Sequence, residues 1–272
     1  NGLTNLVLAK VLASKNIRVT ILFDSKTTGR FYSRSIGLSK KNYDYFNKEI
    51  INIRNISWPI SNIDVFKESK LSQKIFSFNN KSSDIFFIVK YNNIYDSLKK
   101  NLVNNKKIKI IKKRILYKKL IKSNYNLIIN SDLQNKIFKE IFFKKFVKDY
   151  NSIAFTSIAK HSKIKNNTAT QIFTKFGPLA FLPLSNYQTS VVFSILQDKK
   201  YFNEKMIKDL ILKYNKKLKI KSFNKFEKFN LKSIILRKYH NKNILSFGDT
   251  IHKIHPLAGQ GFNMTLRDIN VL

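Results

Sequence analysis

The sequence predicts an α/β protein in which a part that alternates helices with strands is interleaved with a separate, mostly antiparallel β-sheet domain. Helical and strand-like apolar patterns alternate along the first half of the chain. From Ser152 to Leu196 several β-rich stretches follow one another instead, and the alternation returns near the C-terminus. With 272 residues and 43% hydrophobic content, the chain is long enough to bury a core in one or two domains.

The N-terminal half begins with a helix and a strand. Apolar residues recur at helical spacing from Leu3 to Leu12, and the apolar run from Ile17 to Phe23 then predicts a buried strand. Further helices are expected over 41–50, 92–102 and, as a basic helix, 134–147. Further strands are expected over 62–66, 74–78, 84–89, 107–111 and 126–129.

The C-terminal half begins with the β-rich block, which the Gly177-Pro178 turn and Pro183 interrupt. A helix is expected over 203–218, and strands over 233–239 and 244–247. The final helix should start at Gly261. Such a block between two alternating segments favours a separate antiparallel sheet.

The charge of the chain is strongly positive. Fifty-two Lys+Arg against 16 Asp+Glu give +36 at pH 7, but only seven of the basic residues are Arg, and Lys is spread through every segment. This profile is typical of drift in an AT-rich genome, whereas a nucleic-acid binder would use Arg and concentrate its charge on one face. We therefore expect no nucleic-acid partner, although a basic protein that binds nucleic acid or a membrane surface stays an alternative, since each Lys near anionic lipid contributes about 1 kcal/mol.

Composition also limits the chemistry. The chain has no Cys, which excludes disulfides, thiolate catalysis and Cys-ligated metals. No apolar run approaches the roughly 18 residues that a membrane span needs, so we expect a soluble or peripheral protein. We expect it in the cytoplasm, with peripheral association at the inner membrane surface. Because the chain starts in one helical pattern and stops in another, we expect it to be a fragment cut at both ends.

A first candidate site lies at the N-terminus. Gly2 precedes the first helix, and Asp24 ends the strand that follows it, 22 positions later. In a dinucleotide-binding unit the last Gly of G-x-G-x-x-G allows the helix to pack closely on a strand, and an acidic residue about 20 positions on binds the ribose. The first two glycines of that motif and the first strand are absent, so the pattern needs support from elsewhere.

A second and more specific site lies between Asn243 and Asp268. An apolar strand ends at Gly248-Asp249, a Pro/Gly loop follows, and a helix opens after Gly259 and Gly261. Gly248 would let the backbone approach a ligand, and Asp249 can accept a hydrogen bond from a ligand hydroxyl. The helix N-terminus favours an anion.

A metal site is the rival interpretation of this segment. Asp249, His252 and His255 recur at three-residue spacing, as ligands on one helix face would. Pro256 directly after His255 opposes a helix there, so we expect no metal. Loop histidines and turn glycines with purely structural roles remain a further alternative.

The segment closely resembles the second FAD-binding motif of the flavoprotein aromatic monooxygenases, the para-hydroxybenzoate hydroxylase superfamily, and especially the ubiquinone-biosynthesis hydroxylases. Those enzymes carry G-D-A-A-H-x-x-H-P-x-x-G-Q-G-x-N-x-G-x-x-D. Three positions of this chain depart from the motif, namely Thr250, Ile251 and Thr265. Ten match it in order: Gly248, Asp249, His252, His255, Pro256, Gly259, Gln260, Gly261, Asn263 and Asp268.

The resemblance extends over nearly the whole chain. The segment Arg34 to Ser39 is similar to the family's R-A-I-A-L-S, whose Arg lies near the cofactor, and 58–63 and 177–184 are similar to segments of its substrate sheet. One motif is altered, because Leu133 follows Asp132 where relatives carry Gly-Ala-Asp-Gly, a motif linked to FAD and NAD(P)H binding. A side chain there would crowd the nucleotide, which keeps open a decayed or repurposed flavoprotein of a quinone-biosynthesis complex.

The resemblance implies a Rossmann-like FAD-binding domain without its first strand, over 1–58, 92–148 and 241–272, and a β-sheet substrate domain over 59–91 and 149–240. It implies that NAD(P)H reduces FAD and that O2 then hydroxylates a polyprenylated phenol in ubiquinone biosynthesis. It names no catalytic acid or base. It implies the cofactor-binding residues Gly2, Asp24, Arg34, Asp132, Gly248, Asp249, Pro256, Gly259, Gln260, Gly261 and Asn263.

Overall fold

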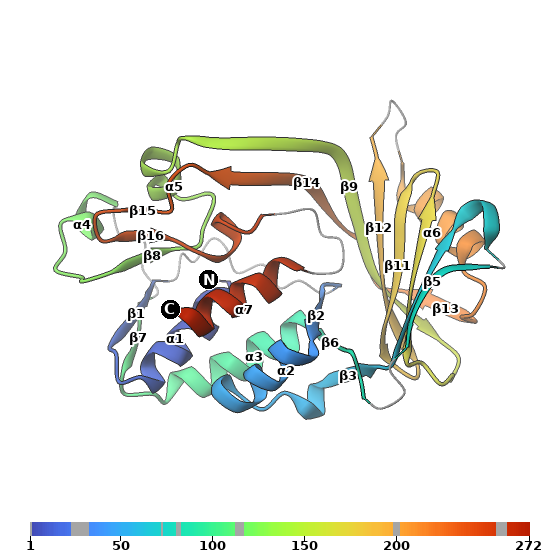
Figure 1. The fold of residues 1–272 in the computed structure, drawn as a ribbon, viewed down its shortest axis with the longest axis horizontal. Helices are drawn as coiled ribbons and strands as arrows, with labels where there is room; N and C mark the ends of the chain where they lie inside the picture. Colours follow the sequence, from blue (N-terminus) through green and yellow to red (C-terminus); the bar gives the residue numbers. More distant parts are fainter. Residues whose placement is uncertain are drawn as a thin grey trace.

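The computed structural model describes residues 2–22, 33–71, 73–79, 83–111, 117–197, 202–253 and 260–272. Figure 1 shows a helix-rich part that contains both chain termini, a β-sheet part beside it, and a long two-stranded ribbon that joins them. The ribbon is formed by β9 (Lys145–His161) and β14 (Glu227–Leu236), which pair antiparallel. The expected α/β class with a large, mostly antiparallel sheet is confirmed.

The helix-rich part contains two pairs of short parallel strands. β1 (Val19–Leu22) pairs with β7 (Ile108–Ile111), and β8 (Ile128–Asn130) pairs with β16 (Ile244–Ser246). Three helices, α1 (Leu3–Ser14), α3 (Tyr91–Val103) and α7 (Gln260–Val271), share one hydrophobic core with β1. Helix α1 lies inside this core, so it is buried around most of its surface rather than along one face.

Shorter elements complete this part. β6 (Phe86–Lys90) lies between β2 (Ser35–Ser39) and β3 (Ser57–Ile60) in an antiparallel sheet, and α2 (Lys40–Tyr45) runs into a π-helical turn over Phe46–Ile50. Near β8 lie α4 (Tyr117–Ile121), α5 (Lys136–Ile141) and β15 (His240–Asn241). Single helical turns occupy Arg54–Ile56, Glu68–Lys70 and Gly248–Thr250.

The large sheet has the strand order β13-β9-β12-β11-β10-β4-β5, and β14 also pairs with β9. Its remaining strands are β4 (Asn62–Lys67), β5 (Lys74–Asn79), β10 (Thr168–Thr174), β11 (Gly177–Ser185), β12 (Gln188–Leu196) and β13 (Ile220–Phe223). Every pairing is antiparallel except that of β10 with β4. The expected β-rich block over 152–196 therefore forms the middle of this sheet.

The two faces of the sheet have different neighbours because successive side chains of a strand point to opposite faces. On the outer face, α6 (Glu204–Tyr214) packs Ile207 and Ile211 against Phe181 and Phe193. The inner face lies toward the helix-rich part, where Ile60 and Ile88 pack with Ala169 and Leu182. The inner face is therefore the boundary between the two parts.

Two expectations about the middle of the chain were wrong in their bounds. The basic helix expected over 134–147 ends at Ile141, and β9 begins at Lys145, because this segment pairs with β14 along the ribbon. The strand expected over 233–239 is the second half of β14. The division into domains stays a prediction, but β6, which lies within the predicted sheet domain, contributes Phe87 and Val89 to the core of the helix-rich part.

Tyr214 at the end of α6 gives the core on the outer face of the large sheet a measurable pH dependence. The pKa of Tyr214 is raised above 10.0, chiefly by burial and further because its hydroxyl donates to Glu68 Oε1 at 2.7 Å. The unfolded chain then releases this proton first, so the free energy of unfolding falls as pH rises above about 10, by up to about 1.4 kcal/mol per pH unit. We expect Tyr214→Phe to flatten this decline in urea unfolding from about pH 9 to 11. The matched variant Tyr187→Phe, at an exposed position, should keep the wild-type slope, and an unchanged slope in Tyr214→Phe would contradict the assignment.

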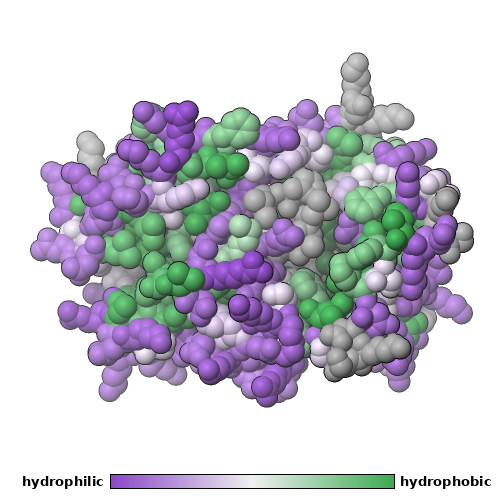
Figure 2. Space-filling view, viewed as in Figure 1, coloured by the Kyte–Doolittle hydropathy of each residue, from purple (hydrophilic) through white to green (hydrophobic). Residues whose placement is uncertain are grey.

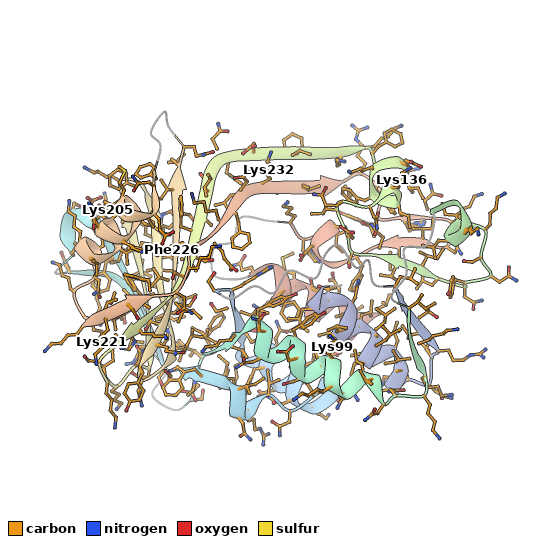
Figure 3. The ribbon with its side chains drawn as sticks, turned by 180° about the vertical axis from the view of Figure 1, so that it is seen from behind. Lys99, Lys136, Lys205, Lys221, Phe226 and Lys232 are labelled. Carbon is orange, nitrogen blue, oxygen red and sulfur yellow. The ribbon has the colours of Figure 1, made fainter. Side chains whose placement is uncertain are left out.

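The basic residues are spread over the whole molecule. Figure 3 labels lysines on α3, α5, α6, β13 and β14, on both parts of the fold. Figure 2 shows hydrophilic side chains around most of the rim and hydrophobic ones gathered in separate groups on both halves of that face. Within the described ranges, we find no helix long and apolar enough to cross a membrane.

Candidate active site

The N-terminus of α1 opens toward solvent. Gly2 is exposed, and a Cβ built on it would meet no atom within 4 Å. The backbone N–H of Leu3 donates to the Tyr91 hydroxyl at 3.3 Å. The positive end of the dipole of this 12-residue helix lies here, beside the exposed Gly2, and favours an anion such as a phosphate group.

The turn after β16 packs directly on α1. Gly248 has φ +63°, and a Cβ on it would lie 2.6 Å from Thr4 Cγ2. Thr250 is fully buried, and its Oγ1 bonds Ser246 Oγ at 2.7 Å and Phe247 O at 2.8 Å. Both the backbone conformation and the close approach of α1 therefore require glycine at 248.

The end of β8 lies beside the same turn. The N–H of Phe247 donates to Asn130 O at 2.9 Å, and Ser131 Oγ donates to Asn5 Oδ1 of α1 at 2.6 Å. Because β8 and β16 are parallel, their carboxyl ends meet at one edge, where ligands bind in open α/β sheets. Asp132 at this edge is exposed, and its Oδ1 accepts the N–H of Gln134 at 2.8 Å.

Charged groups gather around Tyr91. The guanidinium carbon of Arg34 lies 5.3 Å from the centre of the Tyr91 ring. The pKa of Tyr91 is raised, mainly by burial; the Arg34 cation opposes this shift and the Asp249 carboxylate adds to it. Asp249 is exposed, and it makes no hydrogen bond or ion pair with the residues that the structure describes. Its oxygens are therefore available to a ligand.

Helix α7 is tied to the Gly248 turn at both its first turn and its second half. His252 donates its backbone N–H to Gly248 O at 2.9 Å, and its Nε2 lies 2.5 Å from Asp268 Oδ2 on α7. A Cβ on Gly261 would lie 3.2 Å from His252 O, so the helix approaches this turn closely. Gln260, the first residue of α7, is exposed.

Asn263 is buried and bonded to protein groups. Its Nδ2 donates to Gly37 O at 2.7 Å, and its Oδ1 accepts from Ser39 N at 3.1 Å and Asn42 Nδ2 at 2.7 Å. The side chain therefore holds α7 against β2 and α2. The sequence predicts that Asn263 binds the cofactor; direct binding stays a prediction, and the geometry favours a positioning role.

The structure thus brings Gly2, Arg34, Gly248 and Asp249 to one place, with Asp132 at the neighbouring strand end and Gln260, Gly261 and Asn263 on the adjoining helix. Asp24, His255, Pro256 and Gly259 lie outside the described residues. The N-terminus of α1, the cation at Arg34 and the carboxylate of Asp249, which has no partner in the described part of the chain, fit a dinucleotide, which has phosphates and hydroxyls. Among the described His, Asp and Glu side chains, no three are grouped as metal ligands.

Leu133 does not take up a conformation that needs glycine. Its backbone φ is not positive, and its side chain packs against the core of Ile128, Ile137 and Ile244. The structure therefore favours a different role for Leu133 than the expected obstruction of the nucleotide: its side chain adds to the core under β8.

This reading predicts the effect of truncating Leu133. Leu133→Ala should lower the free energy of unfolding by about 1–2 kcal/mol, because the side chain is only partly buried, and should leave FAD affinity unchanged. Urea unfolding and FAD titration measure the two effects. A clear gain in FAD affinity would instead show that the leucine obstructs the site.

Sequence reasoning missed two residues of this site. Thr4 packs on Gly248, and Tyr91 accepts from Leu3 and faces Arg34. Tyr91 had no usable signal, because it follows β6, which pairs only antiparallel and so has no carboxyl edge of the kind that binds ligands in parallel sheets. Thr4 had none either, because it looks like any residue of a helix.

The chain is similar to a known family and to several solved structures. Residues 126–272 match the family described as FAD binding domain. Among solved structures, PqsL from Pseudomonas aeruginosa, in a complex with 2-aminobenzoylacetate, is 12% identical with a TM-score of 0.75, covering 99% of this chain and 82% of that one. The p-nitrophenol 4-monooxygenase PnpA from Pseudomonas putida DLL-E4 is 10% identical with a TM-score of 0.77 (99% and 75% covered).

A third solved structure, 2-methyl-3-hydroxypyridine-5-carboxylic acid oxygenase, is 11% identical with a TM-score of 0.76, covering 98% of this chain and 78% of that one. At these identities the likeness establishes the fold. The family match spans more than half of the chain and includes β8, β16, the Gly248 turn and α7. The chain therefore belongs to the FAD-binding domain family, with FAD as its cofactor.

Proposed function

We propose that this protein is an FAD-dependent monooxygenase that hydroxylates a polyprenylated phenol on the route to ubiquinone, with NAD(P)H as reductant and O2 as co-substrate. The main support is that the α1 N-terminus, Arg34 and Asp249 lie together beside the Gly248 turn. Two solved relatives are named as oxygenases of single aromatic rings, p-nitrophenol and a hydroxypyridine acid. The ten motif positions around Gly248 support the finer assignment to ubiquinone biosynthesis.

The residues of the site have separable tasks in this proposal. FAD, when bound, accepts electrons from NAD(P)H and activates O2. The α1 amides beside Gly2 hold phosphate, and Asp249 accepts hydrogen bonds from hydroxyls of the cofactor. Arg34, kept in place over the Tyr91 ring, supplies a positive charge beside the flavin.

The substrate ring is assigned to the boundary between the two parts. There Ser35 Oγ donates to Ser190 Oγ at 2.9 Å, and Lys90 Nζ donates to Gln188 Oε1 at 2.6 Å, so β2 and β6 are joined to the inner face of the sheet. The apolar residues Ile60 and Ile88 nearby are buried. Exclusion of water by such packing protects a reactive oxygen species from side reactions.

Lys90 is the residue that we assign to the phenol oxygen. Its pKa is lowered, first by burial and then by the nearby Lys160 cation, so its charge lacks compensation. A bound phenolate oxygen would supply the missing negative charge. We expect Lys90→Met to raise KM for the phenol about tenfold at unchanged FAD affinity, while the exposed control Lys99→Met leaves KM unchanged. A KM unaffected by Lys90→Met would remove this residue from the substrate site.

We also propose that the protein meets its polyprenylated substrate at a membrane surface. Phe146 and Ile235 are cross-strand partners on the ribbon, with 65% and 55% of their surfaces exposed. Lys148, two residues along the same strand, is exposed on the same face as Phe146. Exposed apolar side chains beside a lysine suit the interface of an anionic bilayer. The wild-type protein should co-sediment with vesicles that contain phosphatidylglycerol, and the double variant Phe146→Ser with Ile235→Ser should not. Neither protein should co-sediment with neutral vesicles.

The proposed activity is tested by purifying the full-length protein. A flavin absorbance band, and NAD(P)H oxidation that rises when a prenylated phenol is added and yields hydroxylated product, are expected. Folded protein without flavin would reject the proposal. NAD(P)H oxidation without product would favour a repurposed flavoprotein reductase, and steeply salt-dependent DNA binding without flavin would favour a nucleic-acid binder.

A further inference from the structure

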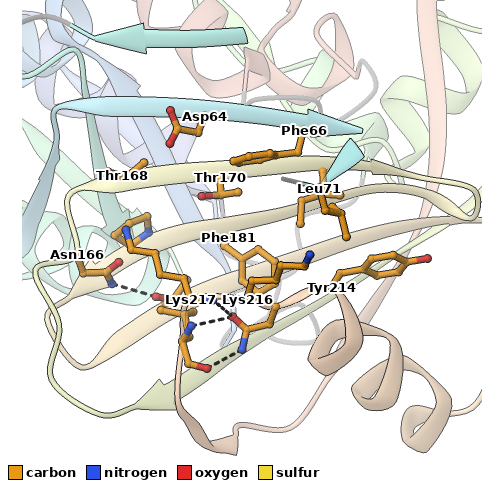
Figure 4. Close-up of a pocket in the computed structure, with 15 residues that line it drawn as sticks. Asp64, Phe66, Leu71, Asn166, Thr168, Thr170, Phe181, Tyr214, Lys216 and Lys217 are labelled. Carbon is orange, nitrogen blue, oxygen red and sulfur yellow. Dashed lines mark hydrogen bonds between the residues drawn. The ribbon is translucent and has the colours of Figure 1, made fainter. Parts of the chain in front are cut away.

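A pocket of about 150 Å³ lies on the outer face of the sheet, away from the proposed flavin site (Figure 4). Alternate residues of β10 show which face this is. Thr168, Thr170 and Ile172 line the pocket, whereas Ala169 belongs to the core of the inner face. The segment 214–218 after α6 forms the opposite wall.

Asn166 places an unpaired acceptor at one end of this pocket. The residue is only 3% exposed. Its Nδ2 donates to Ser185 O at 2.8 Å and to Thr189 Oγ1 at 3.0 Å. Because a carbonyl can only accept, Nδ2 must face Ser185 O, and this fixes the position of Asn166 Oδ1. No described residue donates a hydrogen bond to Oδ1.

The neighbouring network leaves no spare donor for Asn166 Oδ1. His161 Nδ1 lies 2.8 Å from Ser162 O and so carries the proton in the neutral ring. His161 Nε2, 3.0 Å from Thr189 Oγ1, then accepts the Thr189 hydroxyl proton. Thr189 thus donates to His161 and accepts from Asn166. A buried acceptor without a donor costs about 1–3 kcal/mol, which a ligand N–H or O–H would recover.

The rest of the pocket combines an apolar floor with a cationic mouth. Phe66, Phe181 and Pro183 line it, and Figure 4 shows the side chains of Lys216 and Lys217 extending over it toward opposite ends. Both lysines are exposed, and neither ammonium is paired with a described acid. The lining carboxylate of Asp64 is already held by Lys74 at 2.9 Å and Ser77 at 2.7 Å.

We propose that this pocket is a binding site for a single aromatic ring that bears a hydroxyl group and a carboxylate. The hydroxyl donates to Asn166 Oδ1, the ring lies against Phe181 and Pro183, and the carboxylate meets Lys216 and Lys217. A cavity of this volume with apolar walls holds one benzene ring. The site is separate from the substrate site proposed above, because the sheet lies between them.

The test uses the full-length protein with its cofactor and 4-hydroxybenzoate as the probe, followed by calorimetry and ligand-observed NMR. Thr170→Met fills the pocket and should weaken binding at least tenfold. Lys216→Gln with Lys217→Gln should weaken 4-hydroxybenzoate at least fivefold and leave phenol unchanged, since phenol lacks the carboxylate. Benzoate, which cannot donate to Asn166, should bind more weakly than 4-hydroxybenzoate in the wild type.

Matched controls separate this pocket from other sites. Lys219→Gln with Lys221→Gln removes the same charge from exposed residues outside the pocket, and binding should be unchanged. No binding of 4-hydroxybenzoate up to about 10 mM would overturn the proposal. Equal binding by the wild type and the Lys216/Lys217 variant would overturn it too, because the probe would then occupy another site, and this variant changes only exposed side chains.

Discussion

Gly248→Val should lower the free energy of unfolding by about 3 kcal/mol and abolish FAD retention. Two costs add at this position. A β-branched residue at φ +63° is strained by about 1–3 kcal/mol, and its Cβ would lie 2.6 Å from Thr4 Cγ2, an overpacking that costs a similar amount. The turn and α1 must then separate, which moves Asp249 away from the α1 N-terminus. Urea unfolding and flavin absorbance of the purified variant measure the two effects.

Two controls isolate the cause at Gly248. Gly2→Ala adds a methyl group in open space at φ −82°, so its unfolding free energy should stay within about 0.5 kcal/mol of the wild type. Thr4→Ser removes the methyl group that the new Cβ of Gly248→Ala would meet. The double variant Thr4→Ser with Gly248→Ala should therefore lose less unfolding free energy than the two single variants lose together. Strict additivity, or a Gly248→Val protein as stable as the wild type, would contradict the packing described here.

The sequence was sufficient for many of the helices and strands, though not for β2, β3, α4 or β13, and it pointed to the turn at Gly248 as the candidate site. The apolar periods over 3–12 and 92–102 gave α1 and α3, because long periodic patterns report which face is buried. The Gly248-Asp249 pair was found because a strand that ends in Gly-Asp before a Pro/Gly loop is an uncommon pattern. Local signals of this kind do not depend on distant residues.

Other features depend on partners far along the chain. The apolar pattern over 134–147 suits a helix, yet Lys145 begins β9 because β14, about 90 residues later, offers a strand to pair with. Asn263 matches a cofactor motif, but its bonds to Gly37 and Asn42 become visible only when α7 lies on β2 and α2. The contact of Thr4 with Gly248 likewise joins residues 244 positions apart.

Asp249→Ala should weaken FAD binding by about 1.5–3 kcal/mol, the contribution of a hydrogen bond to a charged group. The carboxylate is exposed, lies close enough to Tyr91 to raise its pKa, and makes no hydrogen bond or ion pair within the described part of the chain. Its removal should therefore cost the fold little and the cofactor much. Titration of the apoprotein with FAD, followed by flavin fluorescence, gives the affinity, and urea unfolding of the apoprotein gives the stability.

The matched variant for this test is Asp209→Ala, which removes an equally exposed carboxylate from α6 on the far face of the sheet. It should leave FAD affinity at the wild-type value, so a loss confined to Asp249→Ala reports a local bond rather than the change in net charge. Asp249→Asn keeps one acceptor oxygen and should fall between the wild type and the alanine variant. If Asp249→Ala instead retained full FAD affinity while losing stability, the carboxylate would serve the turn and α1, and the flavin would have to be held by the amides of α1 and α7 alone.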